Sequence, residues 1–183
     1  NNTLAHTQEL IDLLPSLCGD TWGVLVLFAS RRQMEEVFDA LSADLSAKII
    51  KQGTHSKYRL IEQHKSRVDA GEQSIIFGLS SFAEGLDLPG SYCELVVIAK
   101  LPFSVPNSPI ELALKEWVES NGGDAFRDIS LPEASLRLMQ SCGRLMRKES
   151  DSGRIVLLDK RVNSKWYGKQ LLSALPPYHR SAQ

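Results

Sequence analysis

Short apolar runs alternate with helical patterns along most of this chain, and this alternation limits the folds that it can adopt. The run Trp22–Phe28 is apolar throughout, which is typical of a parallel strand buried on both faces. Further strands are predicted at residues 48–52, 74–78, 94–99 and 154–159. The expected fold class is therefore α/β, with a doubly wound, mostly parallel sheet and helices on both faces.

Helices are predicted where apolar residues recur at spacings of three and four. The first is expected to end around Pro15, because proline cannot donate a backbone hydrogen bond. The longest pattern begins at Leu131 and is predicted to continue to Lys148. The other expected helices cover residues 31–41, 56–70, 110–119 and 165–174. Ligands of such sheets bind at the carboxyl ends of the strands, so the loops there are the first candidates for a site.

The charge distribution is uneven although the composition is that of an ordinary globular domain. A net charge of −1 gives no overall sign of a nucleic-acid-binding protein. The segment Arg137–Lys169, however, holds nine Lys or Arg and only three Asp or Glu. This imbalance favours one electropositive edge on a single domain covering residues 1–183, unless acidic residues elsewhere balance it in the folded chain.

Cys18, Cys93 and Cys142 are isolated, and no two cysteines have the spacing of zinc or iron–sulfur ligands. Their apolar surroundings suit buried thiols in a reducing compartment, which favours the cytoplasm. No apolar run approaches the ~20 residues of a membrane span, and no signal peptide opens the chain. Because the chain begins with Asn1 rather than Met, we expect it to be a piece of a longer protein.

Near the end of the predicted helix 131–148, polar and basic residues form a stripe. Gln140, Arg144 and Arg147 stand at positions i, i+4 and i+7, so they would project in one direction. Gly143 costs about 1 kcal/mol of helix stability relative to alanine, but it allows a ligand to approach closely. A glutamine and two arginines suit a polyanion such as a triphosphate. A solvated basic helix face would give the same pattern.

The loop after the third predicted strand is polar and rich in small residues. Ser80 and Ser81 offer hydroxyl and backbone N–H groups that suit a phosphate. Gly85 permits a left-handed backbone, and Glu84 and Asp87 offer carboxylates that suit ribose hydroxyls or arginines. Taken alone, such a loop is more often an ordinary turn.

Considered together, the two stretches resemble known helicase motifs. Ser81–Gly90, S-F-A-E-G-L-D-L-P-G, resembles motif V of superfamily 2 helicases in the form of the XPD/DinG branch. Gln140–Arg147 resembles motif VI, and Ser30-Arg31 resembles motif IV after the first strand. Further segments that resemble bacterial DinG-type helicases, or their YoaA paralogues, are residues 101–109, 131–134, 159–161, 167–169 and 175–177. The resemblance covers nearly the whole chain.

The resemblance implies the second RecA-like motor domain of an ATP-dependent 5′→3′ DNA helicase. It implies an arginine finger on the γ-phosphate, and a loop that links nucleotide and DNA states. The implied roles are catalytic for Arg144 and Arg147; nucleotide-binding for Gln140, Gly143, Glu84, Gly85 and Asp87; and DNA-binding for Ser30, Arg31, Ser80 and Ser81. Which of the loop residues contact DNA and which contact the nucleotide stays open.

The sequence lacks the phosphate-binding motif G-x-x-x-x-G-K-[ST], a D-E-A-H box and the four cluster cysteines of the family. ATP and Mg²⁺ would therefore be bound mainly by the first RecA-like domain, and an iron–sulfur cluster could lie only outside this chain. We expect the isolated chain to be inactive. The partners implied are single-stranded or forked DNA and the first RecA-like domain of the same protein, without a membrane. The complete protein is expected to be a monomer associated with the nucleoid.

Two other hypotheses remain. The chain could be a helicase-like module that binds DNA or protein without hydrolysis. A phosphate-binding motif in the upstream sequence would support the motor, and its absence would support the binding module. It could also be a nucleotide-binding domain unrelated to motors, but Phe28–Arg31 lacks the G-x-G-x-x-G of a dinucleotide site. Aromatic residues such as Trp117 and Trp166 can stack nucleobases, although packing is their more common role.

Overall fold

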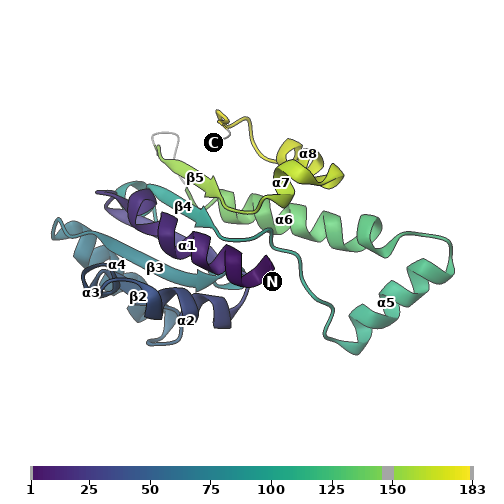
Figure 1. Ribbon diagram of the computed structural model, residues 1–183, viewed down its shortest axis with the longest axis horizontal. Coiled ribbons are helices and arrows are strands. Elements are labelled where there is room, and N and C mark those ends of the chain that lie inside the picture. Colours follow the sequence, from purple (N-terminus) through teal and green to yellow (C-terminus); the bar gives the residue numbers. More distant parts are fainter. Residues whose placement is uncertain (1, 146–150, 182–183) are drawn as a thin grey trace. The chain divides into compact units, whose positions relative to one another are not determined.

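The computed structural model describes residues 2–145 and 151–181, which belong to two compact units (Figure 1). The units are each composed of two segments: Asn1–Lys100 with Ser141–Asp159, and Leu101–Gln140 with Lys160–Gln183. The expectation of a single domain over residues 1–183 stays a prediction.

The first unit is built on a five-stranded sheet in which every pair of neighbouring strands is parallel. The strands are β1 (Gly23–Phe28), β2 (Ile49–Lys51), β3 (Ser74–Leu79), β4 (Leu95–Ile98) and β5 (Arg154–Leu157). Their order in the sheet is β2-β3-β1-β4-β5. This arrangement confirms the predicted parallel α/β fold.

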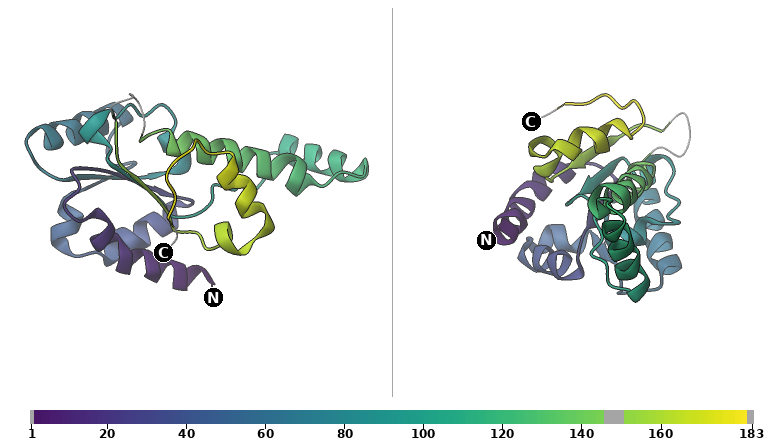
Figure 2. Two further views of the ribbon diagram at one scale, coloured as in Figure 1. Left: turned by 90° about the horizontal axis from the view of Figure 1, so that it is seen from above. Right: turned by 90° about the vertical axis from the view of Figure 1, so that its right-hand side faces the viewer.

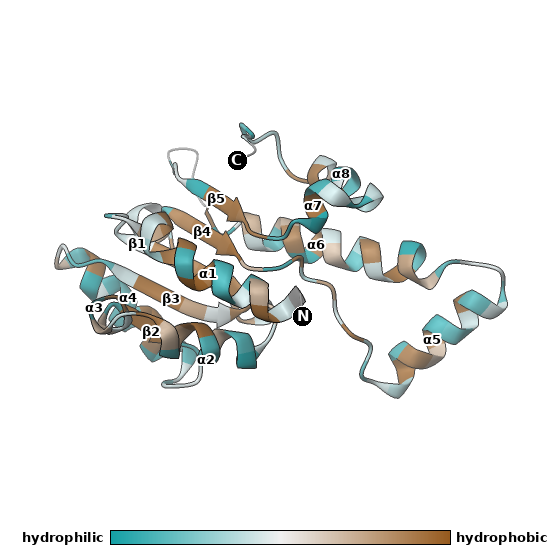
Figure 3. Ribbon diagram, in the orientation of Figure 1, coloured by the Kyte–Doolittle hydropathy of each residue, from teal (hydrophilic) through white to brown (hydrophobic). Residues whose placement is uncertain are grey.

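The central strand β1 is buried along its whole length, which explains its uninterrupted apolar sequence. Val24, Val26 and Phe28 lie in one hydrophobic core with residues of α1 (Asn2–Cys18) and α2 (Arg31–Ala40). The intervening Leu25 and Leu27 are also fully buried, and alternation places them on the other face of the sheet. Figure 3 shows the resulting concentration of hydrophobic residues in the strands.

The opposite face of the sheet is covered by α4 (Lys57–Asp69), which buries Leu60, His64 and Val68. The His64 ring joins this helix to the sheet, since its Nδ1 lies 2.9 Å from Ser74 Oγ at the start of β3. Helices thus cover both faces, as predicted, and Figure 2 shows α1 and α2 separated from α4 by the sheet. The short helix α3 (Ala43–Ala47) lies between α2 and β2 in the sequence and was not predicted.

The second unit is helical. Its helices are α5 (Pro109–Ser120), α6 (Leu131–Cys142, whose last two residues belong to the first unit), α7 (Arg161–Ser164) and α8 (Trp166–Ser173), with a π-helical turn at Phe126–Ser130. A capping box starts α5, in which Ser108 and Glu111 bond each other's backbone N–H groups. No residue of α5 is buried, whereas α6 buries Leu131, Ala134 and Leu138.

Two predicted helix ends are wrong. The helix α1 does not stop at Pro15 but continues to Cys18. Leu10, Leu14 and Cys18 recur every four residues and are all buried in the core, so packing on both sides of Pro15 holds the helix together. The helix α6 ends at Cys142, and residues 143–145 form a turn rather than the predicted continuation toward Lys148.

Candidate functional site

Two of the predicted DNA-binding residues follow β1 at the carboxyl edge of the sheet. Ser30 is the N-cap of α2, and its Oγ accepts a hydrogen bond of 3.3 Å from Gln33 N. Arg31 is exposed and lies beside the turn after β2, where a Cβ built on Gly53 would stand 3.0 Å from Arg31 Nη1. Arg31 therefore follows β1, and its guanidinium lies beside the turn that follows β2.

Ser80 and Ser81 follow β3 in the 3₁₀ turn Ser80–Ala83. The Ser80 hydroxyl donates to the Phe28 carbonyl oxygen at 3.5 Å, so it lies at the end of β1, close in the chain to Ser30. Ser81 is exposed. Gln52 fixes the start of this turn, because its Oε1 accepts a 2.8 Å hydrogen bond from Leu79 N. The four predicted DNA-binding residues thus follow two adjacent strands, β1 and β3.

The loop that continues from this turn is anchored by Leu86 and Leu88, which are 0% and 1% exposed. Between Glu84 and Leu86, Gly85 has φ +72°, a left-handed conformation that favours glycine. The Nζ of Lys57, in the first turn of α4, donates to the Glu84 carbonyl oxygen. The backbone of the loop is therefore held from inside by leucines and from outside by a lysine.

A guanidinium from the segment that resembles motif VI reaches the same loop. Arg144 Nη1 donates to the Leu86 carbonyl oxygen at 2.9 Å, across 58 positions of sequence. Arg144 is half-buried, so water competes less with this charge-assisted bond than it would at the surface. Glu84 and Asp87 are exposed in the loop that Arg144 contacts. The structure thus brings together four of the predicted residues: Glu84, Gly85, Asp87 and Arg144.

The predicted stripe of Gln140, Arg144 and Arg147 on one continuous helix is wrong. After α6 the chain closes into a tight turn, in which Arg144 N bonds the Ser141 carbonyl oxygen at 3.2 Å and Leu145 N bonds that of Cys142 at 3.2 Å. Gly143 lies in this turn, and Gln140 belongs to the second unit. Arg147 lies outside the described residues, so its predicted role stays a prediction.

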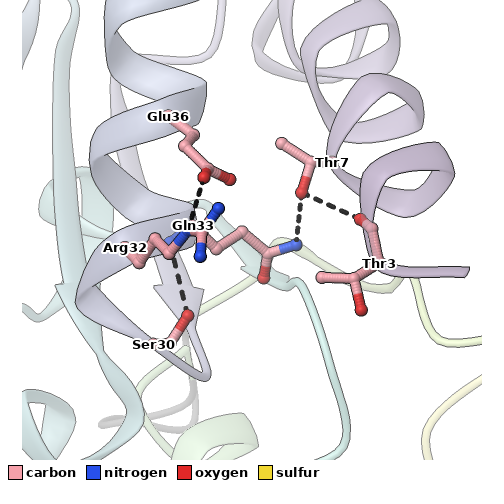
Figure 4. Close-up of polar contacts among 6 residues, drawn as sticks. All are labelled: Thr3, Thr7, Ser30, Arg32, Gln33 and Glu36. Atoms are coloured by element: carbon pink, nitrogen blue, oxygen red, sulfur yellow. Dashed lines mark hydrogen bonds and ion pairs between the residues drawn. The ribbon is translucent and has the colours of Figure 1, made fainter. Parts of the chain in front are cut away.

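A buried polar network beside Ser30 has no counterpart among the predicted site residues (Figure 4). Gln33, 3% exposed, donates through Nε2 to Thr7 Oγ1 at 3.2 Å and lies 3.0 Å from His6 Nδ1. The Nε2 of His6 lies 2.8 Å from the Leu158 carbonyl oxygen, so this nitrogen carries the proton and Nδ1 accepts from Gln33. The Oε1 of Gln33 has no partner among the described residues. The network ties α1 to α2 and to the end of β5.

The described residues contain no group of three or more His, Cys, Asp or Glu side chains that could hold a metal ion. Within residues 2–145 and 151–181, no helix is both long and apolar enough to cross a membrane. The three cysteines are buried and form no disulfide with one another.

A protein-family model described as helicase C-terminal domain matches residues 16–178, which include segments of both units. The chain belongs to this helicase family. The loop at Glu84–Asp87 and the turn at Arg144 both lie within the matched region.

Relatives of this helicase domain include two proteins named ATP-dependent DNA helicase DinG. The protein from Photobacterium profundum is 47% identical over 178 residues, which cover 95% of this chain and 26% of that protein. The protein from Escherichia coli (strain K12) is 45% identical over 156 residues, which cover 85% of this chain and 22% of that protein. This helicase domain therefore spans about a quarter of the length of the curated relatives that it matches.

Solved structures support the same fold. The structure named XPD_Helicase matches with a TM-score of 0.68 and 21% identity, covering 92% of this chain and 30% of that chain. The S. tokodaii Xpd4 structure matches with a TM-score of 0.65 and 20% identity, covering 93% of this chain and 33% of that chain. These matches confirm the predicted RecA-like fold.

Proposed function

We propose that this chain is the second motor domain of an ATP-dependent DNA helicase that unwinds DNA in the 5′→3′ direction. The observation that carries the proposal is the hydrogen bond from Arg144 Nη1 to the Leu86 carbonyl oxygen. It joins the segment that resembles motif VI to the loop that resembles motif V. The family match and the DinG relatives, which are named as ATP-dependent DNA helicases, support the same function.

In the complete protein, the first RecA-like domain would bind ATP and Mg²⁺, and this chain would supply cationic groups to the nucleotide. Arg147 would be the arginine finger, because a guanidinium stabilises the charge that develops on the transferred phosphoryl group. Gln140 and Gly143 would lie beside the nucleotide as well. Arg144 has several N–H donors that point in different directions, so its bond to Leu86 is compatible with a phosphate contact.

The state of the nucleotide would be transmitted to DNA through the bond between Arg144 and the loop. When the nucleotide draws Arg144 toward it or releases it, the Leu86 carbonyl and therefore Gly85 would move as well. Ser80 and Ser81 precede this loop, and their hydroxyl and backbone N–H groups would bind the phosphates of a single strand. Ser30 and Arg31 would contribute from the adjacent strand end. The proposed partners are single-stranded or forked DNA and the first RecA-like domain.

The test is steady-state ATP hydrolysis by the complete protein with single-stranded DNA, together with equilibrium binding of a non-hydrolysable ATP analogue. Arg147→Ala should lower DNA-stimulated kcat by roughly 10³-fold or more, while nucleotide affinity changes far less. Arg147→Lys should restore little activity, because an ammonium lacks the planar fork of a guanidinium. Arg144→Ala should also impair turnover.

Arg137→Ala is the matched control. Arg137 lies on α6 and is 3.8 Å from Glu133 in an exposed pair, so its replacement should be mild. Hydrolysis near the wild-type rate in Arg147→Ala would contradict the arginine-finger role. A complete wild-type protein that binds single-stranded DNA but hydrolyses no ATP would instead support a non-hydrolysing binding module.

A further inference from the structure

Four aromatic rings of the second unit form a connected cluster. Phe103 and Phe126 are stacked with centroids 5.4 Å apart, and Tyr167 contacts both at 5.5 and 5.2 Å. Trp166 is the outer member: its ring meets Tyr167 edge-on at 5.6 Å, yet Trp166 is 56% exposed. Tyr167, by contrast, is only 9% exposed. The buried Tyr167 ring and the half-buried Phe103 and Phe126 rings therefore hold the indole of Trp166 at the surface of the unit.

Basic residues flank this exposed indole in the sequence. From residue 160 to residue 183 the sequence contains five Lys or Arg and no Asp or Glu. Lys165 and Lys169 are exposed and stand one residue before and three residues after Trp166, at the start of α8. The Arg127 guanidinium lies over the Trp166 ring, 4.8 Å from its centroid, and Arg127 also lies 3.6 Å from Asp124 in an exposed ion pair.

We propose that Trp166 is a stacking platform for an unpaired nucleobase, with Lys165 and Lys169 binding the adjacent phosphates of a single strand. An exposed indole between cations matches both parts of a single-stranded nucleic acid, since every base has a π face and every nucleotide carries a charge. An acidic protein segment would use the cations but leave the indole without a partner. The inference rests on the proposed function and adds a contact surface in the second unit, apart from Ser30 and Ser80 of the first.

The second unit supplies a matched control at Trp117. This tryptophan is 65% exposed on α5, so it is as accessible as Trp166. Its helix, however, carries Glu111, Glu116 and Glu119 against a single lysine, and no ring contact anchors it among the described residues. The local charge of α5 repels phosphate, so Trp117 should contribute nothing to strand binding.

The experiment measures binding of two fluorescent strands to the complete protein without nucleotide: oligo-thymidylate, and a strand of equal length with abasic sites. Trp166→Ala should weaken binding of oligo-thymidylate by about 10- to 100-fold, the usual range for loss of one stacked base. Trp166→Phe, which keeps a ring, should bind within about threefold of wild type. On the abasic strand Trp166→Ala and wild type should bind equally, and Trp117→Ala should match wild type on both strands.

A Lys165→Ala, Lys169→Ala double variant separates the phosphate contacts from the stacking. It should weaken binding of both strands, and the slope of log K against log salt should fall by about 1.4, or about 0.7 for each phosphate. Equal loss on both strands in Trp166→Ala would show a structural role and overturn the proposal, as would wild-type binding of oligo-thymidylate by that variant. An unchanged salt slope in the double variant would point to a partner other than nucleic acid. Because only binding is measured, a failure of ATP hydrolysis would overturn the proposed function without deciding this one.

Discussion

His64 joins α4 to the sheet and to the turn before β4 through both of its ring nitrogens. Its Nε2 lies 2.7 Å from the Tyr92 carbonyl oxygen, and its Nδ1 lies 2.9 Å from Ser74 Oγ. A carbonyl oxygen can only accept, so Nε2 carries the proton and Nδ1 accepts from the Ser74 hydroxyl. Both His64 and Ser74 are 0% exposed, so water cannot replace the bond between them, whereas Tyr92 is half-buried.

Replacing His64 with leucine removes both bonds and leaves a side chain of similar size in the core. The buried Ser74 hydroxyl then loses its hydrogen bond at a cost of about 1–3 kcal/mol, and the Tyr92 carbonyl oxygen, which belongs to a half-buried residue, loses its bond at the lower cost of about 1 kcal/mol. The free energy of unfolding should therefore fall by about 2–4 kcal/mol, which lowers Tm by about 4–16 °C for a chain of this length. Thermal unfolding followed by circular dichroism, with urea unfolding at 25 °C, would measure the change.

The same residue makes stability depend on pH. Burial holds the pKa of His64 below its ordinary value of 6.5 in the folded protein, and nearby Arg67 and Lys65 act in the same direction. His64 therefore binds a proton more readily in the unfolded chain than in the folded protein. The stability that neutral His64 contributes is complete above about pH 6.5, and it declines as the pH falls toward the lowered pKa. In His64→Leu that part of the decline should disappear.

Exposed His55, which precedes α4, provides the control. His55→Leu should leave both the free energy of unfolding at pH 7.5 and its decrease between pH 7.5 and pH 5 close to wild type, within about 0.5 kcal/mol. If His64→Leu were as stable as His55→Leu and kept the wild-type pH dependence, the two-bond arrangement of a neutral, buried His64 would be refuted.

Two further changes test the loop and the thiols. Gly85→Ala should lower the free energy of unfolding by about 1–2 kcal/mol, because φ is +72° and the nearest atom to the new Cβ, Lys57 Nζ, is at an ordinary 3.7 Å. Gly71→Ala, with φ +76° and nothing within 4 Å, should cost as much in urea unfolding, but only Gly85→Ala should also reduce DNA-stimulated ATP hydrolysis by the complete protein. Burial raises the pKa of Cys18 to about 11 and that of Cys142 to about 12. At pH 8 a thiol-exchange reagent should therefore label these cysteines slowly in native protein and rapidly in guanidinium chloride, and fast native labelling of either would contradict its burial.

The strands could be predicted from sequence because a strand buried on both faces needs apolar residues at every position. The observed bounds of β1, Gly23–Phe28, differ from the prediction by one residue. Helix ends were harder to predict, since they depend on contacts that a local pattern does not contain. At Pro15 the local rule favoured an end, but burial of Leu14 and Cys18 against the sheet extends α1 by one further turn.

The motif residues were found by resemblance, whereas their geometry was not predictable. Projecting residues 140–147 on a helical wheel assumes an unbroken helix, and α6 ends at Cys142. Gln33 and His6 were missed for a related reason. They are polar residues 27 positions apart, and only the packing of α1 against α2 brings them within 3.0 Å. A glutamine in a helix has no sequence signal that distinguishes it from a solvent-exposed residue.

The loop around Gly85 shows what the fold adds to the motif. The residues on either side of Gly85, Glu84 and Leu86, each have a carbonyl oxygen that accepts a hydrogen bond from a distant cation: Lys57 for Glu84 and Arg144 for Leu86. Gly85 has a positive φ between these two contacts, a conformation that other residues rarely adopt, so we expect its replacement to perturb both. Lys57 belongs to α4, which is anchored to the sheet by His64, whereas Arg144 lies in the turn after α6. A shift of Arg144 against a fixed Lys57 would therefore turn the peptide groups around Gly85, which is the motion that the proposed link between nucleotide and DNA requires.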